Sequence, residues 1–176
     1  IRFIIETYMA ETVNISEMAL KLGEEILSRF GWSLVDGPLD ENFPCDRIDL
    51  HQNKTAKTHP TDCVFRYVDP YSMEGNYFLT DLKSYSAKTL ESKQLNPVVR
   101  RIADAVECAA TSTVWKQRYQ QEEDQDVIVH GLLIIYNHDN QYDKDFRDKL
   151  SAVLPRSHHL PARSRIYVIG PDDIAY

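Results

Sequence analysis

Residues 76–85 read Asn76-Tyr77-Phe78-Leu79-Thr80-Asp81-Leu82-Lys83-Ser84-Tyr85, an apolar run that carries one acid and one lysine two positions apart. Its aromatic and aliphatic residues predict a β-strand. Because side chains alternate between the faces of a strand, Asp81 and Lys83 would share one face while Leu82 would lie on the other. Burial of ions costs free energy unless they are paired or bind a metal. The run therefore predicts either an Asp81–Lys83 ion pair or a metal-dependent site.

A second acid precedes this strand in the segment His59-Pro60-Thr61-Asp62-Cys63-Val64-Phe65-Arg66-Tyr67-Val68. Pro60 favours an extended backbone at its start, and the β-branched and aromatic residues that follow predict another strand. The connector, residues 69–76, is dense in turn-forming residues, so we expect the two strands to form an antiparallel hairpin. Such a hairpin would bring Asp62, at the start of the first strand, near Asp81.

The motif Pro60-Thr61-Asp62 followed by Asp81-Leu82-Lys83 resembles that of the PD-(D/E)xK nuclease superfamily, which has the restriction-endonuclease-like fold. In this chain Thr61 separates the proline from the first acid. The order of the predicted elements carries the resemblance: helix, strand, Asp62 strand, Asp81-Leu82-Lys83 strand, helix and strand, over residues 14–136. The resemblance implies a metal-dependent nuclease in which these acids and Lys83 are catalytic.

The chemistry of phosphodiester hydrolysis agrees with this set of residues. It requires an activated water and stabilisation of a highly charged transition state, and a metal ion supplies both. Mg²⁺ prefers oxygen ligands, so Asp62, Asp81 and the Leu82 carbonyl are its expected ligands, with Mn²⁺ expected to substitute. Lys83 is expected to orient or help deprotonate the attacking water and to offset phosphate charge.

An amphipathic helix is predicted over residues 15–30, with Gly31 as its end. Glu25 lies on the edge of the apolar stripe and Glu24 on the opposite margin. In the resembled superfamily an acid on the first helix often completes the metal site, so Glu25 is the better candidate. Solvated boundary glutamates are the alternative for both.

The remaining elements follow from hydrophobic periodicity and turn residues. Asp46 and Asp49, within one of the predicted strands, are rival metal acids, but Asp62 is preferred because it leads directly into the hairpin. These elements predict an α/β fold with a mixed central β-sheet flanked by helices, in one nuclease-like domain over residues 1–176. The remaining predicted elements are strands at 32–35, 45–51, 126–136 and 165–170, a helical region at 86–113 interrupted near Pro97, and a helix at 146–154. Since the chain begins at Ile1 without a methionine, we expect it to be a fragment of a longer polypeptide.

The composition is that of a globular domain, with 43% hydrophobic and 27% charged residues. No apolar run approaches the roughly 20 residues that span a bilayer. The net charge of −7 opposes indiscriminate nucleic-acid binding, because phosphate contacts need Lys and Arg. A few residues after the Asp81-Leu82-Lys83 strand are nevertheless candidates for substrate binding, with ordinary solvated faces as the alternative. They are Lys88, Lys93, Gln94, Arg100 and Arg101.

The chain has three widely spaced cysteines, Cys45, Cys63 and Cys108. An odd number without close pairs predicts free, buried thiols in a reducing cytoplasm. No C-x-x-C pair occurs, so structural zinc is not expected.

The sequence thus predicts a Mg²⁺-dependent DNA endonuclease, such as the nuclease module of a bacterial restriction or phage-defence system. DNA is the expected partner, and RNA as substrate, an activating protein partner and a homodimer all remain open. One alternative is a catalytically inactive domain of the same fold that binds nucleic acid or a protein. Another is a structural subunit in which Asp81 and Lys83 form only an ion pair.

Overall fold

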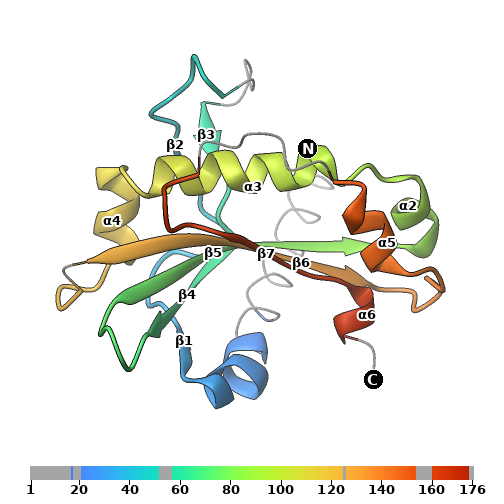
Figure 1. The fold of residues 1–176 in the computed structure, drawn as a ribbon, viewed down its shortest axis with the longest axis horizontal. Helices are drawn as coiled ribbons and strands as arrows, with labels where there is room; N and C mark the ends of the chain where they lie inside the picture. The colour runs from blue at the N-terminus through green and yellow to red at the C-terminus, as the bar shows by residue number, and fades with distance from the viewer. Residues whose placement is uncertain (1–16, 18–20, 52–56, 125, 154–159, 175–176) are drawn as a thin grey trace, which may run out of the picture.

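The computed structural model describes residues 17, 21–51, 57–124, 126–153 and 160–174. Its centre is a five-stranded sheet of order β1-β4-β5-β6-β7 (Figure 1). The first three of these strands pair in antiparallel fashion, and β5, β6 and β7 are parallel, so the sheet is mixed as predicted. The strands are β1 (Trp32–Leu34), β4 (Cys63–Val68), β5 (Gly75–Tyr85), β6 (Val127–Asn137) and β7 (Ile166–Ile169).

Helices flank both faces of this sheet. Residues of α2, α3, α4 and α5 contribute to the larger hydrophobic core on one face, while Leu27 and Ile174, from η2 and α6, pack on the other. Among the described residues, no helix combines the length and apolar character needed to cross a membrane. The helical elements are η1 (Leu22–Ile26), η2 (Leu27–Phe30), α2 (Ala87–Ser92), α3 (Asn96–Ala109), α4 (Thr113–Tyr119), α5 (Phe146–Ser151) and α6 (Pro171–Ile174).

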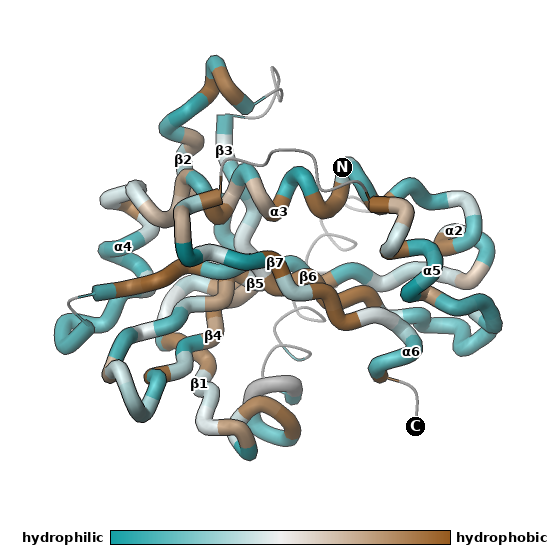
Figure 2. Tube along the Cα trace, in the orientation of Figure 1, coloured by the Kyte–Doolittle hydropathy of each residue, from teal (hydrophilic) through white to brown (hydrophobic). Residues whose placement is uncertain are grey.

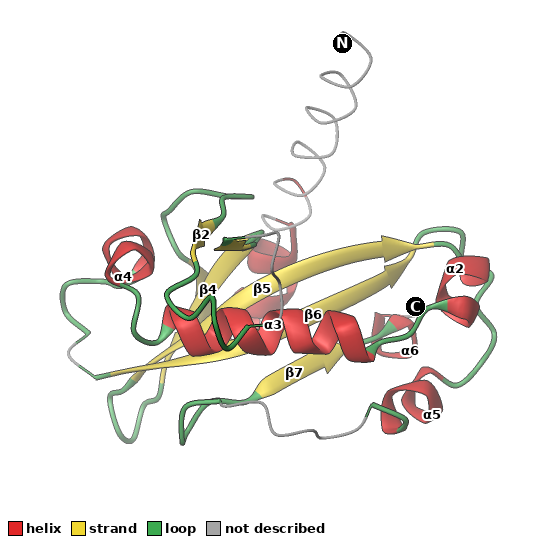
Figure 3. Cartoon of the chain, turned by 90° about the horizontal axis from the view of Figure 1, so that it is seen from above, coloured by secondary structure: helices red, strands yellow, loops and turns green. Residues whose placement is uncertain are grey.

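The longest helix, α3, lies along β5 and β6 (Figure 3). Pro97 occupies its first turn, where a missing amide hydrogen costs no intrahelical bond. The helix approaches the sheet closely at Gly131 of β6, where a Cβ would lie only 3.1 Å from Cγ1 of Ile102. Small residues such as Ala105 and Ala109 form part of the buried face. The crossover from β5 to β6 is therefore packed tightly against the sheet.

The two faces of β5 alternate as the sequence predicts, and hydrophobic residues concentrate on the central strands (Figure 2). Tyr77 and Leu79 belong to the core under α3, whereas Phe78 and Leu82 belong to the core on the opposite face. Phe78 stacks there on Trp32 with ring centroids 3.8 Å apart. The alternation puts Asp81 and Lys83 on the α3 face of the sheet.

The structure differs from the prediction at residues 45–51. The strand expected at 45–51 is wrong: residues 48–50 form a turn, and Ile48 and Leu50 are exposed. Within residues 45–51 the buried side chains are instead those of Cys45 and His51. A small second sheet pairs β2 (Phe43–Pro44) with β3 (Thr58–His59), so β1 pairs with β4 and forms no hairpin with this segment.

The first predicted helix lies partly outside the described residues. Its described end consists of the π-helical η1 and the 3-10 helix η2, followed by Gly31 with a φ of 75°. The predicted apolar stripe of this helix includes Ile26 and Phe30. Leu27 packs against the sheet, but Ile26 and Phe30 are exposed, so the prediction is wrong at these two positions. Two short helices, α4 and α6, were not predicted.

Candidate active site

Asp62 and Asp81 meet across two neighbouring strands. β4 and β5 pair with Cys63 opposite Thr80, and the Asp62 amide donates a 3.1 Å hydrogen bond to the Thr80 carbonyl. One step further along this register, Asp62 lies beside Asp81 on the α3 face. Both side chains are buried, with exposed fractions of 5% and 3%. The predicted hairpin therefore brings the two acids together.

Two cationic side chains bind Asp81. Lys83 Nζ donates to Oδ1 of Asp81, and Nη2 of Arg101 donates to Oδ2 over 2.8 Å. Lys83 Nζ also lies 3.3 Å from the Leu82 carbonyl oxygen. Because Arg101 comes from α3, the helix crossover contributes directly to the site.

The negative charge of Asp62 is balanced by fewer direct partners than that of Asp81. Its Oδ2 accepts a 2.6 Å hydrogen bond from the Leu82 amide. Burial and the neighbouring charge of Asp81 nevertheless raise the pKa of Asp62 to about 6, although the Leu82 amide and Lys83 act in the opposite direction. The site is thus a pair of buried carboxylates in which one acid lacks a direct cationic partner among the described residues.

These oxygen atoms fit a divalent cation. Two adjacent carboxylates and the Leu82 carbonyl are the ligand types that Mg²⁺ and Mn²⁺ prefer. Each carboxylate oxygen has two acceptor sites, so the hydrogen bonds to Asp62 and Asp81 leave capacity for a metal. A nearby cation would also lower the raised pKa of Asp62.

A third acid, Asp40, lies near this pair and was missed from the sequence. Its amide donates a 2.8 Å hydrogen bond to the Asp62 carbonyl, and its charge contributes to the raised pKa of Asp62. Asp40 adopts a φ of 50° within a bend. Its position depends on backbone hydrogen bonds from Asp40 and Glu41 to Asp62 and Thr61, just before β4. Hydrophobic periodicity does not predict such contacts between loops.

The other candidate acids are exposed, unlike Asp62 and Asp81. Glu25 lies in η1 and is exposed. Its role as a metal ligand remains a prediction. Asp46 and Asp49 are also exposed.

Of the candidate substrate-binding residues, Arg101 contacts the acid pair through Asp81. Lys93 Nζ lies 4.8 Å from the ring centroid of Tyr85, two positions beyond Lys83 on the same strand. Nε of Arg100 lies 4.0 Å from Oδ2 of Asp104, one helical turn further along α3. The other two, Lys88 and Gln94, are exposed, and nucleic-acid binding by all five remains a prediction.

A pocket of about 430 Å³ opens beside Arg101. Pro60, two residues before Asp62, lies in its wall. The buried side chains of Cys45, His51 and His59 also line this pocket. All three cysteines are free and buried, as predicted.

Comparison with known proteins adds one finding. A family model described as the GAPS4 protein PD-(D/E)XK nuclease domain matches residues 9–173, a range that includes every residue of the acid pair and its cationic partners. No curated protein and no solved structure matches the chain.

Proposed function

Because the chain belongs to the GAPS4 PD-(D/E)XK nuclease domain family, we propose that it is a metal-dependent endonuclease that hydrolyses phosphodiester bonds of DNA. The observation that supports the reaction is the adjacency of two buried carboxylates, Asp62 and Asp81, with Lys83 and Arg101 bound to the second. Buried like charges are costly for a fold, so their presence on one face favours a site that uses them.

Asp62, Asp81 and the Leu82 carbonyl would hold Mg²⁺, with Mn²⁺ as a substitute. When bound, such an ion supplies positive charge for the pentavalent transition state and makes a bound water more acidic. Hydrogen bonds fix the orientation of the two buried carboxylates, because the Leu82 amide binds Asp62 and two cationic side chains bind Asp81.

Lys83 and Arg101 would act on the substrate. A lysine carries three N–H donors and an arginine five, so both retain donors beyond those that bind Asp81. Lys83 would orient the attacking water and, in its neutral amine form, accept a proton from it, and Arg101 would bind a non-bridging phosphate oxygen. Lys88, Lys93, Gln94 and Arg100 would contact the nucleic-acid backbone farther from the scissile bond.

The direct test is a cleavage assay on supercoiled plasmid DNA with Mg²⁺ or Mn²⁺, with and without EDTA. We expect nicking that depends on the metal and is lost in Asp81→Asn, while Asp148→Asn, an exposed acid on α5, cleaves like wild type. Single-stranded RNA in a parallel reaction decides the substrate class. Cleavage that persists in excess EDTA would remove the metal mechanism.

One observation favours a second candidate. Both carboxylate oxygens of Asp81 are bound by cations, as expected for a catalytically inactive domain in which this network is structural. Such a protein would bind DNA, or a protein partner, and DNA would stay uncut with every metal.

For the active enzyme we propose a cytoplasmic location, because the three thiols are free. We also propose a role in bacterial restriction or phage defence, because the sequence resembles such nucleases. The enzyme would act as a homodimer or with an activating partner.

A further inference from the structure

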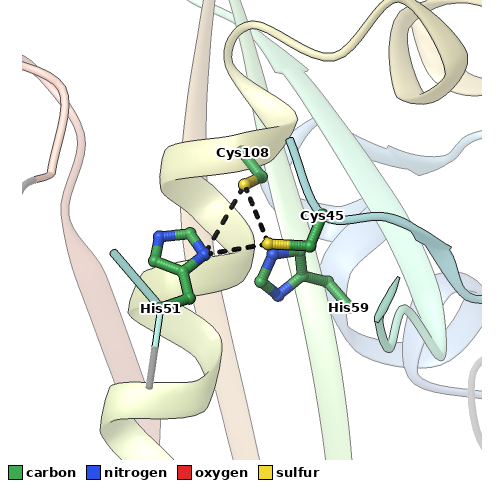
Figure 4. Close-up of side chains that lie close together, drawn as sticks. All are labelled: Cys45, His51, His59 and Cys108. Atoms are coloured by element: carbon green, nitrogen blue, oxygen red, sulfur yellow. Dashed lines mark hydrogen bonds between the residues drawn. The ribbon is translucent and has the colours of Figure 1, made fainter. Parts of the chain in front are cut away.

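Four buried side chains converge between α3 and residues 43–59: Cys45, His51, His59 and Cys108 (Figure 4). Their ligating atoms all lie within 4.8 Å of one another. Cys45 Sγ is 3.2 Å from His51 Nδ1 and 3.9 Å from Cys108 Sγ, and Cys108 Sγ is 3.7 Å from His51 Nδ1. Ligand atoms at zinc bond lengths of about 2.0–2.3 Å in a tetrahedron are about 3.3–3.8 Å apart. These three separations are close to that range.

The ring of His51 is held in the orientation that a ligand needs. Its Nδ1 faces the two sulfurs, while its Nε2 lies 3.2 Å from Oε2 of the buried Glu107. Glu107 is held in turn by an ion pair with Arg47. A carboxylate on the far nitrogen of a ligating histidine fixes its tautomer and its direction, and it is the usual second partner of such a ligand.

The surroundings of His59 also suit a metal ligand. Nε2 of His59 is buried and has no hydrogen-bond partner in the described part of the chain, which costs free energy unless another group binds this ring.

We propose that Cys45, His51, His59 and Cys108 bind a structural Zn²⁺ ion. Two thiolates and two imidazoles are a ligand set that zinc favours, and four buried protein ligands complete its tetrahedral shell without a position for water or substrate. The expectation against zinc relied on the absence of a C-x-x-C pair. That argument considers only ligands that are close in sequence, whereas the fold brings these four side chains together from separate segments.

The ion would connect the segment before the acid pair to the helix above it. His59 lies three residues before Asp62, and Cys108 lies seven residues after Arg101, which is two turns along the same side of α3. Zinc would therefore fix the start of β4 against α3 and keep Asp62 and Arg101 in register around Asp81. This role is structural and separate from the Mg²⁺ proposed at the acid pair.

The test is the metal content of the purified full chain, measured by inductively coupled plasma mass spectrometry after growth with added Zn²⁺. We expect about one zinc per chain in wild type and a loss to background in Cys45→Ser and His59→Gln. Cys63→Ser and His130→Gln are matched controls, because both residues are buried but lie outside the cluster, and they should retain the zinc. Asp81→Asn should retain it as well, whether or not the acid pair is an active site.

A second measurement does not depend on the variants folding. Wild type in which Co²⁺ replaces Zn²⁺ should show a sulfur-to-cobalt charge-transfer band and the intense visible bands of a four-coordinate ion. Wild type without zinc and without these bands would overturn the proposal. So would a Cys45–Cys108 disulfide in the freshly purified protein, or equal zinc in wild type and in folded Cys45→Ser.

Discussion

The backbone amide of Leu82 donates a 2.6 Å hydrogen bond to Oδ2 of Asp62. The donor belongs to the Asp81-Leu82-Lys83 triplet itself, so the backbone of one strand positions the acid of the next. In Asp62→Asn the side-chain oxygen can still accept this hydrogen bond, whereas in Asp62→Ala the Leu82 amide loses it. The two substitutions therefore separate the charge of Asp62 from its structural contact.

The stability of the metal-free protein should depend on pH through Asp62. Burial and the Asp81 charge raise its pKa from 3.8 to about 6, so the folded protein binds this proton more tightly than the unfolded chain does. Between about pH 4 and pH 6 the folded state holds more protons, and this contribution to stability falls as pH rises. Above about pH 6 the loss in free energy of unfolding approaches about 3 kcal/mol.

Urea unfolding in EDTA between about pH 4.5 and pH 7.5 measures this effect as wild type minus Asp62→Asn. The subtraction removes the titration of the acids that do not interact with Asp62. We expect the free energy of unfolding of Asp62→Asn to increase relative to that of wild type as pH rises. A difference that is constant over the range would mean that Asp62 has an ordinary pKa.

Lys83→Ala should lower the rate of cleavage by about 10² to 10⁴-fold, the usual contribution of a proton-transfer group. Lys83→Arg should also fail, because a planar guanidinium that keeps its proton cannot replace a compact ammonium. Arg101 still binds Asp81 in both variants, so the fold should survive. Rates at saturating Mg²⁺ provide the measurement, with Lys144→Ala, a surface lysine paired with Glu91, as the control. Wild-type rates in Lys83→Ala would refute the catalytic role.

Mn²⁺ should raise the melting temperature of wild type but not that of Asp81→Asn. At about tenfold above a dissociation constant of about 1 mM, binding stabilises the folded state by about 1.4 kcal/mol. For a chain of this length that corresponds to roughly 3 to 6 °C. Thermal scans of both proteins, with Asp148→Asn as the matched acid, give the comparison. Equal shifts in wild type and Asp81→Asn would place the ion elsewhere.

Asp124→Asn should destabilise the fold without a specific effect on chemistry. Asp124 is buried and accepts hydrogen bonds of 2.7 and 2.6 Å from Arg66, and the Tyr77 hydroxyl donates to it as well. Removal of its charge leaves Arg66 without its main partner, at a cost of about 3 kcal/mol, or roughly 6 to 12 °C in melting temperature. Cleavage well below the melting temperature should remain near the wild-type rate. Loss of activity with an unchanged melting temperature would contradict this assignment.

The hairpin of the acid pair was predictable from sequence because its signals are local. Turn residues at 69–76 and the two-residue alternation of β5 predict both the pairing of the strands and the shared face of Asp81 and Lys83. The contact of Arg101 with Asp81 could be anticipated only as a general basic site, since it depends on how α3 packs over the sheet.

Asp40 and the Cys/His cluster were not predictable for a related reason. Asp40 reaches Asp62 through an irregular bend, and Cys108 joins Cys45 across 63 positions of sequence. Ile48 and Leu50 suggested a strand because their alternation resembles a buried face, yet both are exposed. Hydrophobic periodicity contains no information about which side chains a loop buries against a distant helix.

The pairing of β4 with β5 also has a consequence for the order of folding. These strands are adjacent in sequence and joined by a short turn, whereas β6 reaches β5 only after the crossover of residues 86–126. Contacts between nearby residues require less loop closure and form sooner. We expect Asp62 and Asp81 to meet in a nascent hairpin before Arg101 arrives with α3, so that repulsion between the two acids slows the first steps and the docking of the helix relieves it.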